Sequence, residues 1–411
     1  MAEIKPFAAY RPAPGMESRI AALPYDVYNR REACEEVRRN PDSFLAVDRA
    51  ETGFDERIDT YAPEVYQRAA ELLRQWIAEG RFVKDEKPCY YLYEQVMDGR
   101  SQTGIVACAS IDDYMNNVIK KHENTRADKE LDRIRHVDVC DMQTGPIFLA
   151  YRGNAVLKGI ISLVKRERPI CDFVSEDGIR HRVWVIDDDK LIAAIYQEFS
   201  KVSAVYIADG HHRCASAVKV GLKRREEHPG YKKEEEFNYF LSVLFQDEEL
   251  HILDYNRVIK DLNGLSEEEF LHRLEENFKI TRIGTEAYRP EEKGTFGMYL
   301  GNVWYKLTAL DKIRSKDAVK GLDVSLLQDW ILGPMLGIFD PKTDSRIDFV
   351  GGIRGLEEME RRVHTDMKIA FSMYPTSMSE LENVADAGRL MPPKSTWFEP
   401  KLRSGLFLHE L

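Results

Sequence analysis

The sequence predicts an α+β fold with a mixed sheet, because hairpin signals and helices are interspersed without the regular strand–helix repeat of a doubly wound parallel sheet. Asp98-Gly99 separates two strand-like runs within residues 88–111, and this dipeptide favours a tight hairpin turn. Gly301-Asn302 marks a second hairpin further along the chain. These signals favour antiparallel pairs mixed with helices.

The first third of the chain contains clear helix and strand patterns. Residues 19–51 predict strand, loop, helix, loop and strand in that order, with Asn29 as the helix N-cap and Glu32 at the capping-box position. Residues 61–79 place apolar side chains at helical spacing, and Gly80 ends this helix. After the first hairpin, a polar segment predicts a helix, a break and a second helix.

The middle of the chain leads to its most unusual stretch. Residues 201–209, KVSAVYIAD, predict a strand, and the segment from Cys214 to Gly221 predicts a helix. Residues 236–259 predict another hairpin. The pattern changes near residue 256, so we expect two domains, 1–255 and 256–411, the second also α+β.

Composition limits the classes of function. The chain is 43% apolar and 31% charged, as in soluble globular proteins, and 70 acidic against 59 basic residues give a net charge of −11. This acidity argues against a nucleic-acid partner. No apolar run approaches the roughly 20 residues that span a bilayer, and the N-terminus has no apolar signal core. Six scattered cysteines without a C-x-x-C pair indicate reduced thiols, so we expect a cytoplasmic protein. The absence of a long apolar run leads us to expect no membrane partner.

The run Asp209, Gly210, His211, His212 and Arg213 joins the strand to the helix that follows. A helix that begins after a glycine turn offers free backbone N–H groups and the positive end of its dipole, which suit a phosphate. Arg213 would hold phosphate oxygens in a two-pronged contact. Asp209 would serve as a base or as a Mg²⁺ ligand. The alternative is a capped turn with solvated histidines.

A second candidate cluster lies in the charged segment KHENTRADKE. Glu123 and Asn124 are oxygen ligands of the kind that Mg²⁺ prefers, and Asp113 is a further candidate ligand. Arg126 would screen phosphate charge, together with Arg133. The alternative is a charged and capped start of a helix.

A third candidate is the C-terminal segment MPPKST. Lys394 supplies a cation, and Ser395 and Thr396 supply hydroxyl groups. Asp26 and Glu51, each after an expected strand, are weaker candidates. Each of these groups also fits an ordinary loop.

Other constellations are less well supported. His122, Glu123, His211 and His212 would suit Zn²⁺, but neighbouring histidines such as His211 and His212 rarely ligate one metal ion. The chain has no H-E-x-x-H, no G-x-S-x-G, no Walker A motif and no dinucleotide-binding glycine pattern after a strand. Cys214 lies within the helix after the turn, which disfavours a cysteine nucleophile.

The chain resembles the bacterial and archaeal domain-of-unknown-function family 1015 along nearly its whole length. The resemblance is carried by LPYDV, KHENT, IADGHHR and MPPKSTWFEPKLRSGL, whereas YNRREA departs from the family pattern. The DGHHR turn also resembles that of ADP-dependent free-serine kinases of archaea. They belong to the ParB/sulfiredoxin-like superfamily, which implies a core of that kind in residues 1–255, with nucleotide phosphates bound at the helix start. Glu123-Asn124 matches in type the ParB pair that helps to hold Mg²⁺, but it precedes the turn here and follows it in ParB.

These observations lead to one main hypothesis and two alternatives. The main hypothesis is phosphoryl transfer between ADP or ATP, with Mg²⁺, and a small hydroxyl compound such as serine. In this hypothesis Asp209 accepts the proton of the substrate hydroxyl or orients that hydroxyl, and His212 helps to hold the transferred phosphate. The alternatives are a nucleotide-binding regulatory protein without catalysis and a metal-dependent hydrolase. Whether the chain forms a homodimer is left open.

Overall fold

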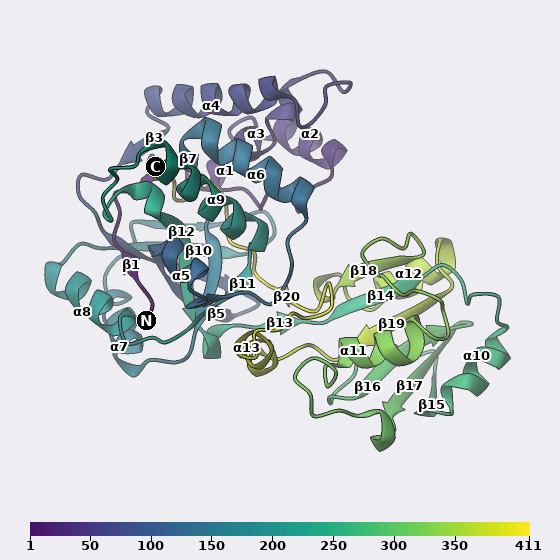
Figure 1. Cartoon of the computed structure of the whole chain (residues 1–411). Helices are drawn as coiled ribbons and strands as arrows, with labels where there is room; N and C mark the ends of the chain where they lie inside the picture. Colours follow the sequence, from purple (N-terminus) through teal and green to yellow (C-terminus); the bar gives the residue numbers. More distant parts are fainter. The chain divides into compact units, whose positions relative to one another are not determined.

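The computed structural model describes residues 1–411 and divides the chain into two compact units. The first unit is Met1–Leu250 together with Pro400–Leu411, and the second is His251–Glu399 (Figure 1). The last residues of the chain, which the sequence analysis places in the C-terminal domain, therefore fold with the first unit. No helix has the length and apolar character needed to cross a membrane.

A nine-stranded sheet organises the first unit. Its strands are β1 (Ile4–Lys5), β4 (Tyr90–Met97), β5 (Arg100–Ser110), β6 (Ile119–Lys120), β8 (Ile147–Tyr151), β9 (Cys171–Val174), β10 (Arg180–Ile186), β11 (Val205–Asp209) and β12 (Tyr239–Gln246). They pair in the order β6-β11-β8-β12-β5-β4-β10-β9, with β1 paired to β5. The pairs β6–β11 and β8–β12 are parallel and the others antiparallel, which confirms the predicted mixed α+β class.

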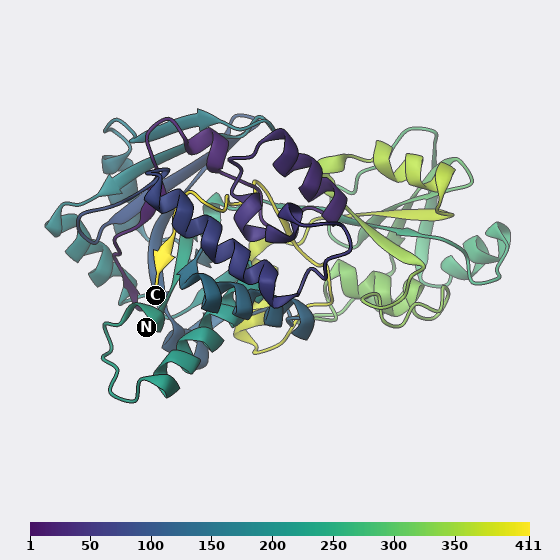
Figure 2. The same ribbon diagram turned by 90° about the horizontal axis from the view of Figure 1, so that it is seen from above.

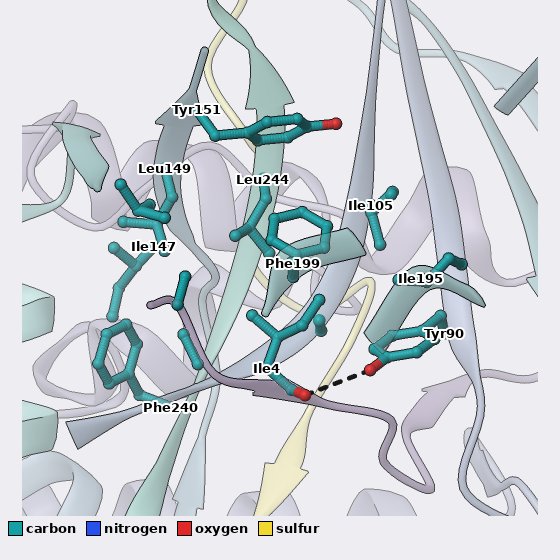
Figure 3. Close-up of a cluster of buried hydrophobic side chains, with 14 of the residues drawn as sticks. Ile4, Tyr90, Ile105, Ile147, Leu149, Tyr151, Ile195, Phe199, Phe240 and Leu244 are labelled. Carbon is teal, nitrogen blue, oxygen red and sulfur yellow. Dashed lines mark hydrogen bonds between the residues drawn. The ribbon is translucent and has the colours of Figure 1, made fainter. Parts of the chain in front are cut away.

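Nine α-helices accompany this sheet. They are α1 (Glu17–Ile20), α2 (Arg30–Arg39), α3 (Leu45–Asp48), α4 (Pro63–Ala78), α5 (Ile111–Met115), α6 (Ala127–Cys140), α7 (Ala155–Val164), α8 (Asp189–Phe199) and α9 (His211–Glu227). The main core packs apolar residues of the sheet against α7, α8 and α9. Figure 3 shows sheet residues of this core with Ile195 and Phe199 of α8. Within it, the Tyr90 hydroxyl donates to the Ile4 carbonyl at 3.3 Å, so β1 is fixed to β4 as well as to β5.

A second core lies beneath the N-terminal helices. Phe44, Trp76 and Phe82 pack together there, and the capping box of Asn29 and Glu32 at the start of α2 is confirmed. The predicted strand around residues 45–48 is wrong, because this segment is helix α3. A short apolar run fits either a buried strand or a buried helix, and here the local Asp48 N–Phe44 O bond of 3.1 Å closes a helical turn.

Two of the three predicted hairpins are confirmed. Asp98-Gly99 joins β4 to β5 and Gly301-Asn302 joins the strands of the second hairpin, and all four residues have positive φ as a tight hairpin turn requires. The hairpin predicted in residues 236–259 is wrong. Its first half is strand β12 of the first unit, which pairs with β5, and its second half is a strand of the second unit. The polar turn Asp247–Glu249 separates the two strands, and each pairs with a distant segment instead of with the other.

The C-terminal residues complete the first unit. The strand β21 (His409–Glu410) pairs with β7 (Met142–Gln143), and a shorter ladder joins β2 (Tyr10–Pro12) to β3 (Phe82–Lys84). The Leu408 side chain enters the core of the N-terminal helices, and the yellow C-terminal strand lies next to these helices in Figure 2. The tail is thus a buried element of this unit.

The second unit contains a six-stranded antiparallel sheet in the order β15-β17-β16-β19-β14-β18. Its strands are β14 (Tyr255–Ile259), β15 (Phe278–Gly284), β16 (Thr295–Leu300), β17 (Val303–Ala309), β18 (Ile347–Gly351) and β19 (Ile369–Met373). A separate ladder joins β13 (Ile252–Leu253) to β20 (Trp397–Phe398). The helices are α10 (Glu267–Leu274), α11 (Asp323–Leu327), α12 (Glu357–Thr365) and α13 (Met378–Asp386).

A buried carboxyl group at the start of α11 gives the second unit a pH dependence. Burial raises the pKa of Asp323 from 3.8 to about 7, although the Gly294 N–H donates to the carboxylate at 2.9 Å. The folded chain therefore keeps a proton that the unfolded chain releases at lower pH. The free energy of unfolding should fall by about 1.4 kcal/mol per pH unit through this window. Urea unfolding at pH 5 and pH 8 tests this: Asp323→Asn should gain stability relative to the wild type as the pH rises.

The exposed Asp311 provides the matched control for this experiment. Asp311→Asn should show the same pH dependence as the wild type. An Asp323→Asn variant that tracks the wild type between the two pH values would mean that Asp323 is ionised throughout.

Candidate functional site

The turn between β11 and α9 forms the centre of the candidate site. The strand is buried up to Ala208, and its ladder with β8 is irregular just before Asp209. Gly210 has φ of +88°, a left-handed backbone conformation that residues with a side chain rarely adopt. A Cβ added at this position would lie 3.3 Å from the Arg213 guanidinium. Helix α9 then begins at His211 with no side chain capping it. The turn therefore leaves backbone N–H groups of the first helical turn for a ligand.

Asp209 is held ionised by two cations. The Lys401 Nζ lies 3.2 Å from its carboxylate, and Lys401 comes from the C-terminal residues of the same unit. Burial opposes the charge, but Lys401 and Arg213 outweigh it and hold the pKa of Asp209 well below its ordinary value. A carboxylate of this kind is a weak proton acceptor, so its position suits it better to orient groups than to act as a base.

Arg213 directs its side chain back toward the sheet. Its Nη1 donates to the Pro146 carbonyl at 2.7 Å. A Cβ on Gly145 would lie 3.1 Å from the same Nη1 and 2.9 Å from the Ser404 hydroxyl, so the backbone approaches the guanidinium closely here. One nitrogen of the predicted two-pronged contact is thus already bound within the protein.

The loop before α6 contacts the first turn of α9. The backbone N–H of Arg126 donates to His212 Nε2 at 2.9 Å, and the Arg126 side chain pairs with Asp128. The Ser216 hydroxyl donates to the carbonyls of His212 and Glu130 at 2.7 and 3.0 Å. The structure therefore brings together two clusters that the sequence placed 86 positions apart.

Three side chains converge at this junction. Ligand atoms of His122, Glu123 and His211 all lie within 4.8 Å of one another. The two imidazole rings are 4.5 Å apart and nearly perpendicular. Burial lowers the pKa of His122 to about 4 and that of His211 well below its ordinary value, so both rings are neutral at pH 7. His212 is not part of the group, and the sequence analysis disfavoured a zinc site that would use both His211 and His212.

Two predicted Mg²⁺ ligands lie outside this group. Asn124 is exposed. Asp113 is buried in α5, where it accepts from the Glu3 N–H at 2.6 Å, and burial raises its pKa to about 6. The neighbouring Asp112 pairs with Arg225 at 2.6 Å. The two adjacent carboxylates therefore fix α5 to other segments.

The predicted C-terminal cluster belongs to the second unit. The Lys394 carbonyl accepts from Arg257 at 2.9 Å, and its Nζ lies 5.7 Å from the centre of the Tyr255 ring. The Ser395 hydroxyl donates to the Pro392 carbonyl at 2.6 Å. Thr396 follows directly in the chain, and the role of the three residues at a phosphate stays a prediction.

A polar cavity of about 220 Å³ lies in the first unit between α4, α6 and the N-terminal loops. Charged, phenolic and imidazole groups surround it, namely Tyr25, Asp26, Tyr28, Asp48, Arg49, Glu51, Tyr61, Tyr66, Lys129, Asp132, Arg133 and His136. A narrower cavity shares Tyr25, Asp48 and Arg133 with it and reaches Arg213. The candidate site therefore extends from the start of α9 into a hollow with charges of both signs.

Arg133 is a buried residue that lines both cavities. Its guanidinium lies 2.9 Å from the Asp132 carboxylate and 4.0 Å from the centre of the Tyr25 ring. Arg49 binds the carbonyls of Tyr25 and Tyr28 at 3.0 and 2.7 Å, which orders the loop that carries Asp26. The residues that line this cavity come from separate parts of the chain, so no local sequence motif predicts it.

Three comparisons place the chain among known proteins. Solved structures that resemble it include a C-terminally truncated SbnI from Staphylococcus aureus, with a TM-score of 0.39, 10% identity, and 72% of this chain and 82% of that chain covered. A mutant free serine kinase in complex with ADP has a TM-score of 0.35 and 13% identity, covering 71% and 87% of the two chains. A conserved hypothetical protein from Pyrococcus furiosus has a TM-score of 0.34 and 14% identity, covering 73% and 93%.

These likenesses are too low to carry a conclusion about activity, and no match is found among curated proteins. The family described as "Protein of unknown function (DUF1015)" matches residues 4–325, which is well over half of the chain. This match includes the turn at the start of α9 and the loop that contacts it. The chain therefore belongs to the DUF1015 family.

Proposed function

We propose that the first unit binds a nucleotide at the start of α9 and transfers a phosphoryl group between it and a small hydroxyl compound. Serine and O-phosphoserine are the first pair to test, because the DGHHR turn resembles that of free-serine kinases. With ADP, the bond between the β-phosphorus and the bridging oxygen would break. The serine Oγ–phosphorus bond would form, AMP would leave, and the hydroxyl proton would pass to solvent.

The observation that carries the proposal is the uncapped start of α9 beside Lys401 and Arg213. Free N–H groups, the helix dipole and two cations meet there, and each favours a phosphate. Phosphoryl transfer depends mainly on positioning and on the neutralisation of charge. The turn supports both requirements. Mg²⁺ would accompany the nucleotide, with Glu123 and Asn124 as its proposed ligands.

The role proposed for Asp209 is narrower than that of a general base. Lys401 and Arg213 keep it ionised, so it would orient the acceptor hydroxyl and fix Lys401 rather than store a proton. A loose transition state needs little help from a base before the phosphorus–oxygen bond breaks. The low pKa is therefore compatible with transfer.

The polar cavity supports an amino-acid acceptor. A free amino acid carries one ammonium and one carboxylate group. Arg133 offers a buried cation for the carboxylate, and Asp26 and Glu51 offer carboxylates for the ammonium group. A volume of about 220 Å³ is sufficient for a molecule of this size.

A second candidate is nucleotide binding without catalysis. The ion pair between Asp209 and Lys401 favours it, because a turn whose carboxylate is already occupied can bind phosphate without reacting.

Phosphorus NMR of the purified protein with Mg²⁺ separates the candidates. ADP, ATP and CTP are each mixed with serine, and AMP is mixed with O-phosphoserine for the reverse direction. A new phosphomonoester resonance that requires both nucleotide and serine supports transfer. Nucleotide binding by calorimetry without a new resonance supports the second candidate, and the absence of binding overturns both.

A further inference from the structure

We infer that His122, Glu123 and His211 bind one divalent transition-metal ion of the Zn²⁺ class. This goes beyond the proposed phosphoryl transfer, in which Glu123 is a ligand of Mg²⁺: here Glu123 binds the transition metal with the two histidines, and Mg²⁺ stays with the nucleotide phosphates. The donor set contains two imidazoles and one carboxylate, from the loop after β6 and from the first residue of α9. Two histidines and one glutamate are a known ligand set of catalytic zinc.

The spacing of the ligand atoms fits one ion. They lie within 4.8 Å of one another, and ligands around a tetrahedral zinc ion lie about 3.3 Å apart, given bond lengths of about 2 Å. Small side-chain rotations therefore close the three groups around a metal. The loop that carries His122 and Glu123 is already held against the first turn of α9 by the hydrogen bond from the Arg126 N–H to His212 Nε2.

The His211 ring provides an independent observation. Its side chain is 8% exposed, and its Nε2 is buried with no hydrogen-bond partner. A buried polar atom without a partner is destabilising and rare in folded proteins, so it requires an explanation. Metal coordination by a neutral imidazole satisfies such an atom.

The His122 ring has the support that metal-binding histidines usually have. It forms a hydrogen bond with the backbone of Ile207 in β11. A second bond of this kind fixes the orientation of a ligating imidazole and raises its basicity. His122 is 2% exposed and lies beside the sheet, so its position is set by the core.

The donor chemistry selects the metal. Mg²⁺ prefers oxygen ligands and keeps several waters, whereas imidazole nitrogen suits Zn²⁺, Cu²⁺, Fe²⁺ and Ni²⁺. Three protein ligands leave a fourth position for water or a ligand oxygen. His211 is the first residue of α9, so a metal bound here would lie beside the same turn.

Titration of metal-stripped protein with Co²⁺ and Zn²⁺, without nucleotide, tests the inference. Visible Co²⁺ absorption and metal content by mass spectrometry should give one bound equivalent. His122→Gln, Glu123→Gln and His211→Gln should each weaken binding at least about tenfold. His228→Gln, at the exposed end of α9, should bind as the wild type does, and circular dichroism should confirm that all variants are folded.

The outcomes separate this inference from the proposed function. Wild-type protein without a stoichiometric site overturns the metal site, as does a folded His211→Gln that binds Co²⁺ as tightly as the wild type. Displacement of Co²⁺ by equimolar Mg²⁺ would also overturn it, because that indicates an oxygen site. A bound metal in a protein without phosphoryl transfer removes only the proposed function.

Discussion

Asp209→Asn is expected to reduce kcat/KM for phosphoryl transfer about 10²-fold, the cost of a misplaced reacting group, while the protein stays folded. Asparagine keeps the shape of the side chain but removes the charge that fixes Lys401 and orients the acceptor hydroxyl. Binding of the nucleotide should change little, because the N–H groups of α9 are unaffected. Steady-state kinetics and calorimetry measure the two effects separately.

Lys401→Met is the companion variant. If Asp209 acts chiefly by fixing Lys401, the two single variants and the double variant should lose similar activity, since they disrupt one unit. If Asp209 orients the hydroxyl directly, its own substitution should cost more than that of Lys401. Near-normal transfer by folded Asp209→Asn would remove Asp209 from the reaction.

Arg133→Met is expected to lower the free energy of unfolding by about 3–5 kcal/mol, because it leaves Asp132 as an uncompensated buried charge. Arg133 and Asp132 are 6% and 7% exposed, so bulk solvent compensates poorly for the lost partner. Urea unfolding followed by circular dichroism measures the change. Asp132→Asn in the Arg133→Met background should recover part of the loss, because it removes the charge and keeps an oxygen acceptor for the Tyr66 hydroxyl.

Arg135→Met is the matched control on the same helix. Its side chain is exposed and contacts the Tyr61 carbonyl at 3.4 Å and the Tyr66 hydroxyl, but it pairs with no buried charge, so its removal should change stability by about 0.5 kcal/mol or less. Equal effects at positions 133 and 135 would contradict the assignment of Arg133 to a buried ion pair.

Local signals in the sequence predicted local structure well. Asp98-Gly99 and Gly301-Asn302 specify their turns because few residues adopt the positive φ that these turns require. The strand, glycine turn and helix around Gly210 follow the same logic, and they locate the candidate site. In each case the physical cause lies within a few residues of the feature.

Features that depend on distant pairing were not predictable in this way. Lys401 lies 192 positions after Asp209, and no pattern near either residue indicates their contact. The hairpin expected in residues 236–259 failed for the same reason, since β12 finds its partners in β5 and β8. Asp113 looked like a metal ligand by type, but its burial beside Glu3 is decided by packing.

The return of Pro400–Leu411 to the first unit has a consequence for how the protein is made. During synthesis, the sheet that carries Asp209 emerges long before the residue that neutralises it. The core around Leu408 and the ion pair of Lys401 can therefore close only after the ribosome has translated the whole of the second unit. Until then the nascent first unit lacks a strand, and Asp209 has Arg213 but not Lys401 as a cation beside it. The folding of residues 400–411 onto the first unit, rather than that of its N-terminal part alone, therefore completes the proposed site.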